Sequence, residues 1–440
     1  MAFDNGTIRP RYWVDPSGRQ VSATLPLPSR EFLAAATVYT AAVFNFVLAI
    51  VNAHAFDLNK TSIIVAEMLI VGVAVAICAK SLNRLMFPWV VVISALAILF
   101  IIISMFRQTL EAKYFRDVLL IPIFIMLGTT YVKGNIVRLF VVLQATILAV
   151  MIFEGLSPAL FGEIANPQRY YINTREFPIE AFWNPNSSLF VSATRPPGMG
   201  QFFDWVQALG ITSRLSSVFL EPVTLGNWAT VAVIFLTAFW HNLTRKETIF
   251  LIGSTFLILV GSDGRFATVT ILMIAAVTMI IRIIPRYVYA LYLPGAVCAA
   301  IVVGIFFDTR ITADDFLGRL AFSVHVLSSM NVWDALGLDA RLLDSSADSG
   351  ITYFILSQSF LGVFIIWLAI CFLQPQTNRT AHVYMNGLSI YISLSLLISF
   401  SMFSIKTAAP LWFLYGYVRA MSASSAQEEE PFLLPPRPGR

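Results

Sequence analysis

The sequence predicts an all-α polytopic membrane protein with about twelve transmembrane helices, and three observations support this fold class. Of its 440 residues, 58% are hydrophobic and 12% are charged, whereas soluble domains usually carry about 25% charged residues. The mean hydropathy is +0.76. The apolar residues form long runs separated by short polar connections, as expected of membrane-spanning helices. The net charge of +4 is scattered over these connections, which argues against a nucleic-acid partner.

Each apolar run predicts one span, because roughly 20 apolar residues cross the hydrocarbon core of a bilayer. The predicted spans are 32–53, 62–79, 86–106, 117–132, 138–156, 217–240, 248–261, 265–284, 287–307, 351–373, 384–403 and 407–420. Residues 1–31 and 421–440 are predicted to be cytoplasmic tails. Spans one to five thus occupy 32–156, spans six to nine 217–307, and spans ten to twelve 351–420. Two long loops, 157–216 and 308–350, separate these groups.

The orientation follows from basic residues, which prefer the cytoplasmic side of a membrane. If the N-terminus is cytoplasmic, all five short inner connections carry Lys or Arg. The residues concerned are Lys80, Arg84, Lys133, Arg138, Arg245, Lys246, Arg282, Arg286 and Arg379. Both tails are then cytoplasmic, and both long loops lie on the outer face.

A second set of basic residues lies on the disfavoured outer side. It consists of Arg107, Lys113, Arg116, Arg214, Arg265, Arg310 and Arg319. We expect an anion, such as a lipid pyrophosphate, to hold these residues there. For Arg107, Lys113 and Arg116, the alternative is that their side chains extend to lipid headgroups.

The two outer loops are predicted to fold over the mouth of the bundle, because long loops without structure are uncommon unless they are functional. The first is rich in proline, and its segment 199–211 has apolar residues at near-helical spacing. We expect this segment to form a short amphipathic helix in the membrane interface.

Two helix entrances combine a basic residue with polar neighbours. Arg214 and Glu221 precede Pro222 at the start of the sixth span, where they either anchor the helix or belong to a site facing a cavity. At the eighth span, Ser262 or Asp263 is expected to cap the helix. Capping does not explain Arg265, because a cation is disfavoured at a helix N-terminus. A bound phosphate would resolve that conflict.

Three residues are candidates for acid–base chemistry: Asp348, His325 and Glu221. Asp348 is equally suited to capping the tenth span, and His325 to a solvated position in the loop. Glu67 and Glu154 lie near outer helix ends, where an isolated carboxylate would be either protonated or paired, with the outer arginines as candidate partners. Because the three cysteines lie inside apolar runs and no nucleotide, dinucleotide or zinc motif is present, the sequence predicts neither a cofactor nor a metal site.

In their order along the chain, these motifs resemble the O-antigen ligase/polymerase superfamily, and most of all the Wzy-type polymerases of xanthan-like exopolysaccharides. The resemblance covers about residues 60–405. It rests on Arg214 with Phe219-x-x-Pro222, Ser262-x-x-Arg265, Arg319 with Gly337-Leu-Asp339, Asp348-Ser-Gly350, and Gln358-Ser-Phe-Leu-Gly362.

The resemblance implies a bundle of the GT-C type in the bacterial inner membrane, working without a metal at the periplasmic face. Its substrate would be an oligosaccharide on undecaprenyl pyrophosphate, and its further partners a chain-length regulator and export machinery. By the same resemblance, Arg214 and Arg265 would bind the pyrophosphate, with Arg319, Arg116 and Arg107 as further candidates. Ligase-type members tend to have His-Asn where this chain has Asp348-Ser349, which favours a polymerase.

Two alternatives remain open at the level of sequence. One is an O-antigen ligase that transfers glycan to a lipid A core. The other, from a different class, is a secondary transporter of an anionic solute, which would predict paired broken helices near the middle of the membrane.

Overall fold

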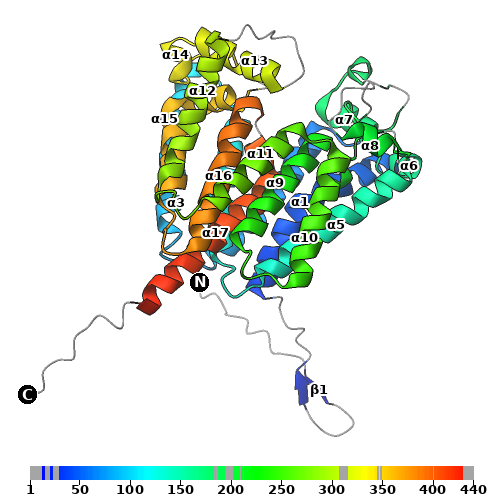
Figure 1. Cartoon of the computed structure of the whole chain (residues 1–440), viewed down its shortest axis with the longest axis horizontal. Coiled ribbons are helices and arrows are strands. Elements are labelled where there is room, and N and C mark those ends of the chain that lie inside the picture. The colour runs from blue at the N-terminus through cyan, green and yellow to red at the C-terminus, as the bar shows by residue number, and fades with distance from the viewer. Residues whose placement is uncertain are drawn as a thin grey trace, which may run out of the picture.

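The computed structural model of the chain describes residues 12–14, 20–22, 29–182, 184, 187–193, 202–208, 210–211, 213–306, 316–343, 346, 349–399 and 401–429. Strands β1 (Tyr12–Val14) and β2 (Gln20–Ser22) pair as a short antiparallel hairpin. The other described elements are helices, and the long ones stand side by side in a bundle (Figure 1).

Each of the twelve predicted spans coincides with a long helix. These helices are α1 (Arg30–His54), α2 (Lys60–Ala79), α3 (Phe87–Arg107), α4 (Ala112–Thr129), α5 (Ile136–Leu156), α9 (Pro222–Ala238), α10 (Arg245–Ser262), α11 (Arg265–Met279), α12 (Tyr292–Phe306), α15 (Gly350–Phe372), α16 (Arg379–Ile398) and α17 (Ile405–Glu429). Six of them, α1, α2, α3, α5, α15 and α16, are long and apolar enough to cross a membrane. The fold is therefore that of a helical, multi-pass membrane protein.

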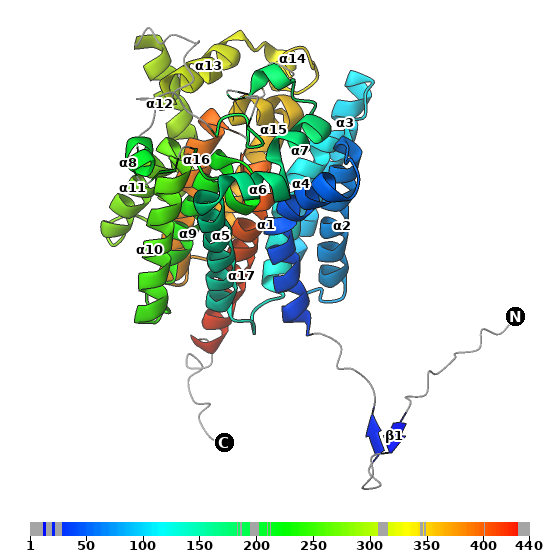
Figure 2. The same ribbon diagram turned by 90° about the vertical axis from the view of Figure 1, so that its right-hand side faces the viewer.

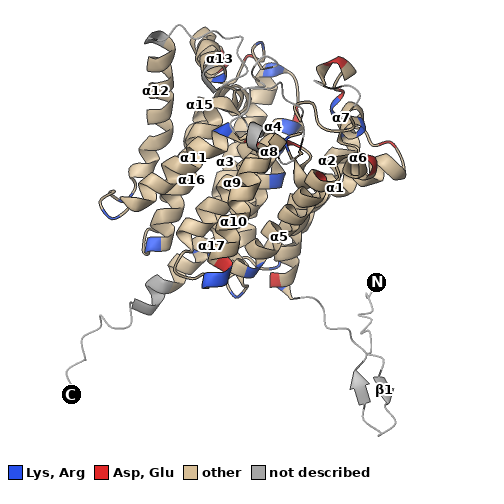
Figure 3. Cartoon of the chain, turned by 45° about the vertical axis from the view of Figure 1, so that its right-hand side comes forward, with Lys and Arg blue, Asp and Glu red and all other residues tan. Residues whose placement is uncertain are grey.

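Shorter helices gather at one end of the bundle, which we call the loop end (Figure 2). They are α6 (Pro158–Ala165), α7 (Pro167–Arg175), α8 (Phe203–Ala208), α13 (Phe316–Ser329) and α14 (Val332–Ala335). Helix α1 begins, and α17 ends, at the opposite end, which we call the terminal end. Lys, Arg, Asp and Glu lie mostly towards these two ends (Figure 3).

The described parts of the two long loops contain short helices beyond the one that the sequence predicted. Of the amphipathic helix expected at 199–211, the structure has the six-residue α8, while 199–201 and 209 lie outside the described residues. His325, expected in an irregular loop, lies on α13. Asparagine caps explain part of this order, because the Asn166 side chain accepts a hydrogen bond from the Arg169 backbone N–H at the start of α7.

The centre of the bundle depends on close contact between α4 and α17. A Cβ atom added at Gly128 would overlap the carbonyl oxygen of Phe413, and one added at Gly416 would overlap that of Ile125. Small residues that let two backbones touch are typical of helix packing in membranes. Helix α16 is also interior, since 89% of its apolar window is buried, against 22% for α2 and for α3. Helices α2 and α3 therefore lie at the periphery.

Candidate functional site

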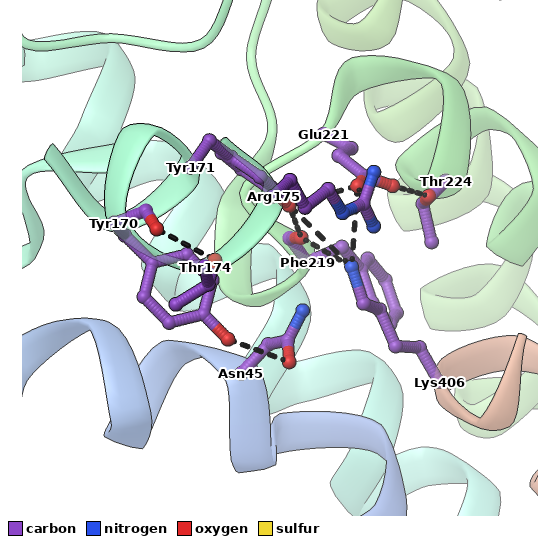
Figure 4. A network of polar contacts seen from close by, with 9 residues as sticks. All are labelled: Asn45, Tyr170, Tyr171, Thr174, Arg175, Phe219, Glu221, Thr224 and Lys406. Carbon is purple, nitrogen blue, oxygen red and sulfur yellow. Dashed lines mark hydrogen bonds and ion pairs between the residues drawn. The ribbon is translucent and has the colours of Figure 1, made fainter. Parts of the chain in front are cut away.

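A cluster of charged side chains lies at the loop end beneath α7 (Figure 4). Glu221 Oε1 is 2.7 Å from Arg175 Nη2 and 3.5 Å from Lys406 Nζ. The Tyr171 hydroxyl donates to the same oxygen at 2.8 Å, and the Thr224 hydroxyl donates to Glu221 Oε2 at 2.6 Å. Three segments far apart in the sequence, α7, the start of α9 and the start of α17, therefore meet at one carboxylate.

Local backbone geometry places Glu221 in this cluster. A 3₁₀ turn, η2 (Ser217–Phe219), leads into α9, and Leu220 takes the left-handed conformation with φ 61°. Pro222 then occupies the first position of α9, where the missing N–H costs no helical hydrogen bond. Glu221 is the N-cap residue, but its side chain makes no capping bond. Its carboxylate is therefore available to Arg175 and Lys406.

Helix α7 covers the cluster and is anchored to the bundle beside it. The Tyr170 hydroxyl donates to Asn45 Oδ1 of α1 at 3.1 Å (Figure 4). The Arg175 guanidinium lies over the Tyr171 ring, 4.8 Å from its centroid, a favourable cation–π distance. The Arg175 side chain is 46% exposed, whereas that of Lys406 is 5% exposed. Arg175 thus forms the rim of the cluster and Lys406 its floor.

The cluster carries an excess of positive charge, because the two cations Arg175 and Lys406 share the single carboxylate of Glu221. Burial raises the pKa of Glu221, but Arg175 and Lys406, with hydrogen bonds from Thr224 and Tyr171, outweigh burial and lower this pKa to about 2. Glu221 is therefore ionised at neutral pH, and within this cluster two cations share one carboxylate.

A second ionic network contains Arg116, one of the predicted site residues. Its guanidinium lies 2.7 Å from both Glu67 Oε2 and Asp117 Oδ1, and Asp117 Oδ2 accepts a hydrogen bond from the Tyr353 hydroxyl. Helix α2, which carries Glu67, packs against α7, so this network borders the cluster described above. The predicted pairing of Glu67 with an outer arginine is confirmed.

The predicted pairing of Glu154 with an arginine is wrong. This carboxylate is fully buried and accepts hydrogen bonds from the backbone N–H groups of Ser216 and Ser217 and from the Ser216 hydroxyl, at 2.6–2.8 Å. Backbone donors of the turn before α9 thus take the place of a cation. Glu154 fixes this turn to α5.

Arg214 is 4% exposed and lies against the turn between α10 and α11. Its Nε donates to the Ser262 carbonyl at 2.9 Å, and the Leu215 N–H donates to the Gly261 carbonyl at 2.8 Å. Arg265, the first residue of α11, is exposed. The structure therefore brings Arg214 to the turn that leads into Arg265.

The expected cap of α11 by Ser262 or Asp263 is wrong. Gly264 is the N-cap residue, without a side-chain bond, and Asp263 ends α10 in the left-handed conformation with φ 48°. The Asp263 carboxylate accepts instead from the Phe202 N–H at 2.8 Å. The Asp263 carboxylate thus binds a backbone N–H from a distant segment instead of the N–H groups at the start of α11.

The remaining predicted residues lie elsewhere. Arg107 donates from Nε to the Gly337 carbonyl at 2.7 Å and from Nη2 to the Leu356 carbonyl, so it ties α3 to α15. Arg319 is half-buried on α13 and His325 is exposed on it, over a different part of the loop end from α7 (Figure 1). Asp348 and Arg310 lie outside the described residues.

Sequence reasoning missed Arg175 and Lys406. Lys406 lies at the predicted outer end of the last predicted span, which begins one residue after it. The argument that singled out the other outer cations applies to it equally. Arg175 lies in the proline-rich loop, where no local pattern distinguishes it from Arg169.

Among the described residues, no group of three or more His, Cys, Asp or Glu side chains could hold a metal ion. The chain matches no protein-family model, no curated protein and no solved structure.

Proposed function

We propose that this protein polymerises oligosaccharide repeat units carried on undecaprenyl pyrophosphate. In this proposal all twelve long helices span the bacterial inner membrane in a GT-C-like bundle, and both termini are cytoplasmic. The observation that carries the proposal is the cationic cluster at the loop end, where Lys406 is almost fully buried and Arg175 reaches the surface. Enclosed cations at the end of an apolar bundle suit a ligand that is both lipid-anchored and strongly anionic.

The proposed reaction is an inverting glycosyl transfer. A hydroxyl at the non-reducing end of a new lipid-linked unit attacks the anomeric carbon of the growing glycan. The bond from that carbon to the pyrophosphate oxygen breaks, and undecaprenyl pyrophosphate leaves with the electron pair. Guanidinium and ammonium groups stabilise the charge that develops on the leaving group. Arg175 and Lys406 join Arg214 and Arg265 in this role, with Arg319, Arg116 and Arg107 as weaker candidates.

The acceptor hydroxyl must lose its proton to a base. The three predicted candidates for this base are Glu221, Asp348 and His325. A general base works best when its pKa is near the operating pH. The pKa of Glu221, about 2, is too low for that, and its contacts suit it to positioning Arg175 and Lys406. Asp348 and His325 remain the candidates for the base.

The test compares two arginines of the same short helix. Arg175→Gln is expected to lower polymer formation by about 10²–10³-fold, as removal of one preorganised donor typically does. Arg169→Gln is the matched control, because Arg169 pairs at the surface with Asp57, and it should leave polymer unchanged. The measurement is gel sizing of polysaccharide from cells that carry only the variant copy. Arg265→Ala should behave like Arg175→Gln, because the exposed Arg265 side chain has the same proposed role in binding the pyrophosphate.

Normal polymer from both Arg175→Gln and Arg265→Ala would refute the proposed site. The same assay separates a polymerase from an O-antigen ligase. Loss of a polymerase leaves single repeats, whereas loss of a ligase leaves long chains on the carrier lipid.

A secondary transporter of an anionic solute is the second candidate, because α15 is broken at Ser359, with φ 63° and ψ 161°. Broken helices hold substrates in many transporters, in matching positions of two repeated halves. Among the described long helices, α15 is the one with such non-helical backbone inside it, so a matching partner is not evident there. Solute uptake by reconstituted vesicles would favour this candidate over the polymerase.

A further inference from the structure

A second polar cluster lies at the terminal end of the bundle, where the proposed function has no role for it. It consists of Arg419 on α17 and of Gln374 and Gln376 in the connection from α15 to α16. Their exposed fractions are 6%, 0% and 5%. Charged and amide side chains are rarely so buried unless they have partners.

Hydrogen bonds on both sides of Arg419 put it at the level of the two glutamines along the bundle. One turn earlier on α17, the Tyr415 hydroxyl donates to the Ile370 carbonyl at 2.8 Å. Three residues later, the Ser422 carbonyl accepts from the Thr377 hydroxyl at 3.1 Å, and the Ser422 hydroxyl accepts from Asn378 Nδ2 at 3.1 Å. Because α15 and α17 run in the same direction at this point, Arg419 lies level with residues 374–376.

Most polar atoms of these side chains have no hydrogen-bond partner within the described chain, although Gln376 Nε2 donates to the Gln374 carbonyl at 3.4 Å. Arg419 Nε and Nη1, both side-chain polar atoms of Gln374 and Oε1 of Gln376 make no hydrogen bond within the described chain. No described carboxylate forms an ion pair with Arg419. An arginine that merely reaches towards lipid headgroups would expose its charged end, and a buried, unpaired guanidinium is strongly destabilising. The amide oxygens of the glutamines can accept hydrogen bonds, but they leave the charge uncompensated.

We infer that Arg419 and Gln374 form an anion site at the terminal end that binds the phosphate of a membrane lipid headgroup. The guanidinium can donate two parallel hydrogen bonds to a phosphate, and the Gln374 amide can supply another. A membrane lipid can supply this phosphate, because the site lies next to the membrane-facing surface. Phe372, two residues before Gln374, is 55% exposed on the apolar surface that faces acyl chains in a membrane.

The test measures lipid binding to the purified full-length protein by native mass spectrometry. Phosphatidylglycerol is the probe, and diacylglycerol, which lacks the phosphate, is the negative control. Arg419→Gln is expected to weaken phosphatidylglycerol binding about tenfold or more, as loss of a hydrogen-bonded charge does. Arg138→Gln, which removes an exposed arginine from the same end, should leave binding unchanged.

Gln374→Leu provides a second readout if Arg419→Gln does not fold, because it keeps the charge and should reduce affinity partially. Displacement of the lipid by inorganic phosphate would support the site and show that it also accepts a soluble phosphate. Two results would overturn the inference: equal phosphatidylglycerol affinity of the wild-type protein, Arg419→Gln and Gln374→Leu, or equal binding of diacylglycerol.

Discussion

Glu221→Ala is expected to lower the free energy of unfolding by about 3–5 kcal/mol, the usual cost of removing one partner of a buried ion pair. The substitution leaves the Lys406 ammonium, 5% exposed, without its carboxylate. Arg175 can turn towards solvent, because almost half of its side chain is already exposed, but Lys406 cannot. The measurement is thermal unfolding of the purified protein in detergent.

Two further variants provide a control and a rescue for this prediction. Glu163→Ala removes an exposed carboxylate from α6 at the same loop end and should change stability little. Adding Lys406→Met to Glu221→Ala should restore much of the loss, since no buried charge is then left unpaired at this site. If Glu221→Ala were as stable as Glu163→Ala, the cluster would not be the enclosed ionic site described here.

Gly416→Ala is expected to destabilise the fold by about 3 kcal/mol or more, at the upper end of the usual effect of overpacking. The added methyl group would overlap the Ile125 carbonyl oxygen and lie 2.9 Å from the Gly128 Cα atom. Both obstacles are backbone atoms, so relief requires α4 and α17 to move apart along their whole contact. Thermal unfolding in detergent measures this effect as well.

Gly253→Ala is the matched control, because Gly253 also lies in a long helix but a Cβ atom there meets nothing within 4 Å. We expect it to be neutral or stabilising by up to about 1 kcal/mol, from the higher helix propensity of alanine. Similar unfolding temperatures for Gly416→Ala and Gly253→Ala would show that α4 and α17 are not in backbone contact.

The long helices were predictable from sequence because their signal is local. An apolar run of sufficient length forms a helix in a membrane whatever its neighbours are, since the backbone must satisfy its own hydrogen bonds. The short helices of the loop end are different. Helix α7 is held by contacts such as Tyr170 to Asn45, 125 residues apart in the sequence, and no local pattern encodes such a pairing.

The candidate site was predictable in part for the same reason. Glu221 and Arg214 stand out because a charged pair at the entrance of a predicted span is costly and usually faces a cavity. Their actual partners come from elsewhere in the chain, as Arg175 and Lys406 show for Glu221. The expected cap at Asp263 failed because a tertiary donor, the Phe202 N–H, competed successfully with the local one. Sequence thus identified where charge is concentrated, but not which charges meet.

The most direct test of the proposed function is reaction of the purified protein with a defined undecaprenyl-pyrophosphate oligosaccharide, followed by sizing of the products. The proposal predicts lipid-linked chains of two, three and more repeats from the wild-type protein, with one undecaprenyl pyrophosphate released for each new linkage. It also predicts that Arg175→Gln forms few such chains while Arg169→Gln forms them normally. A folded wild-type protein that leaves the substrate at the length of a single repeat would contradict it.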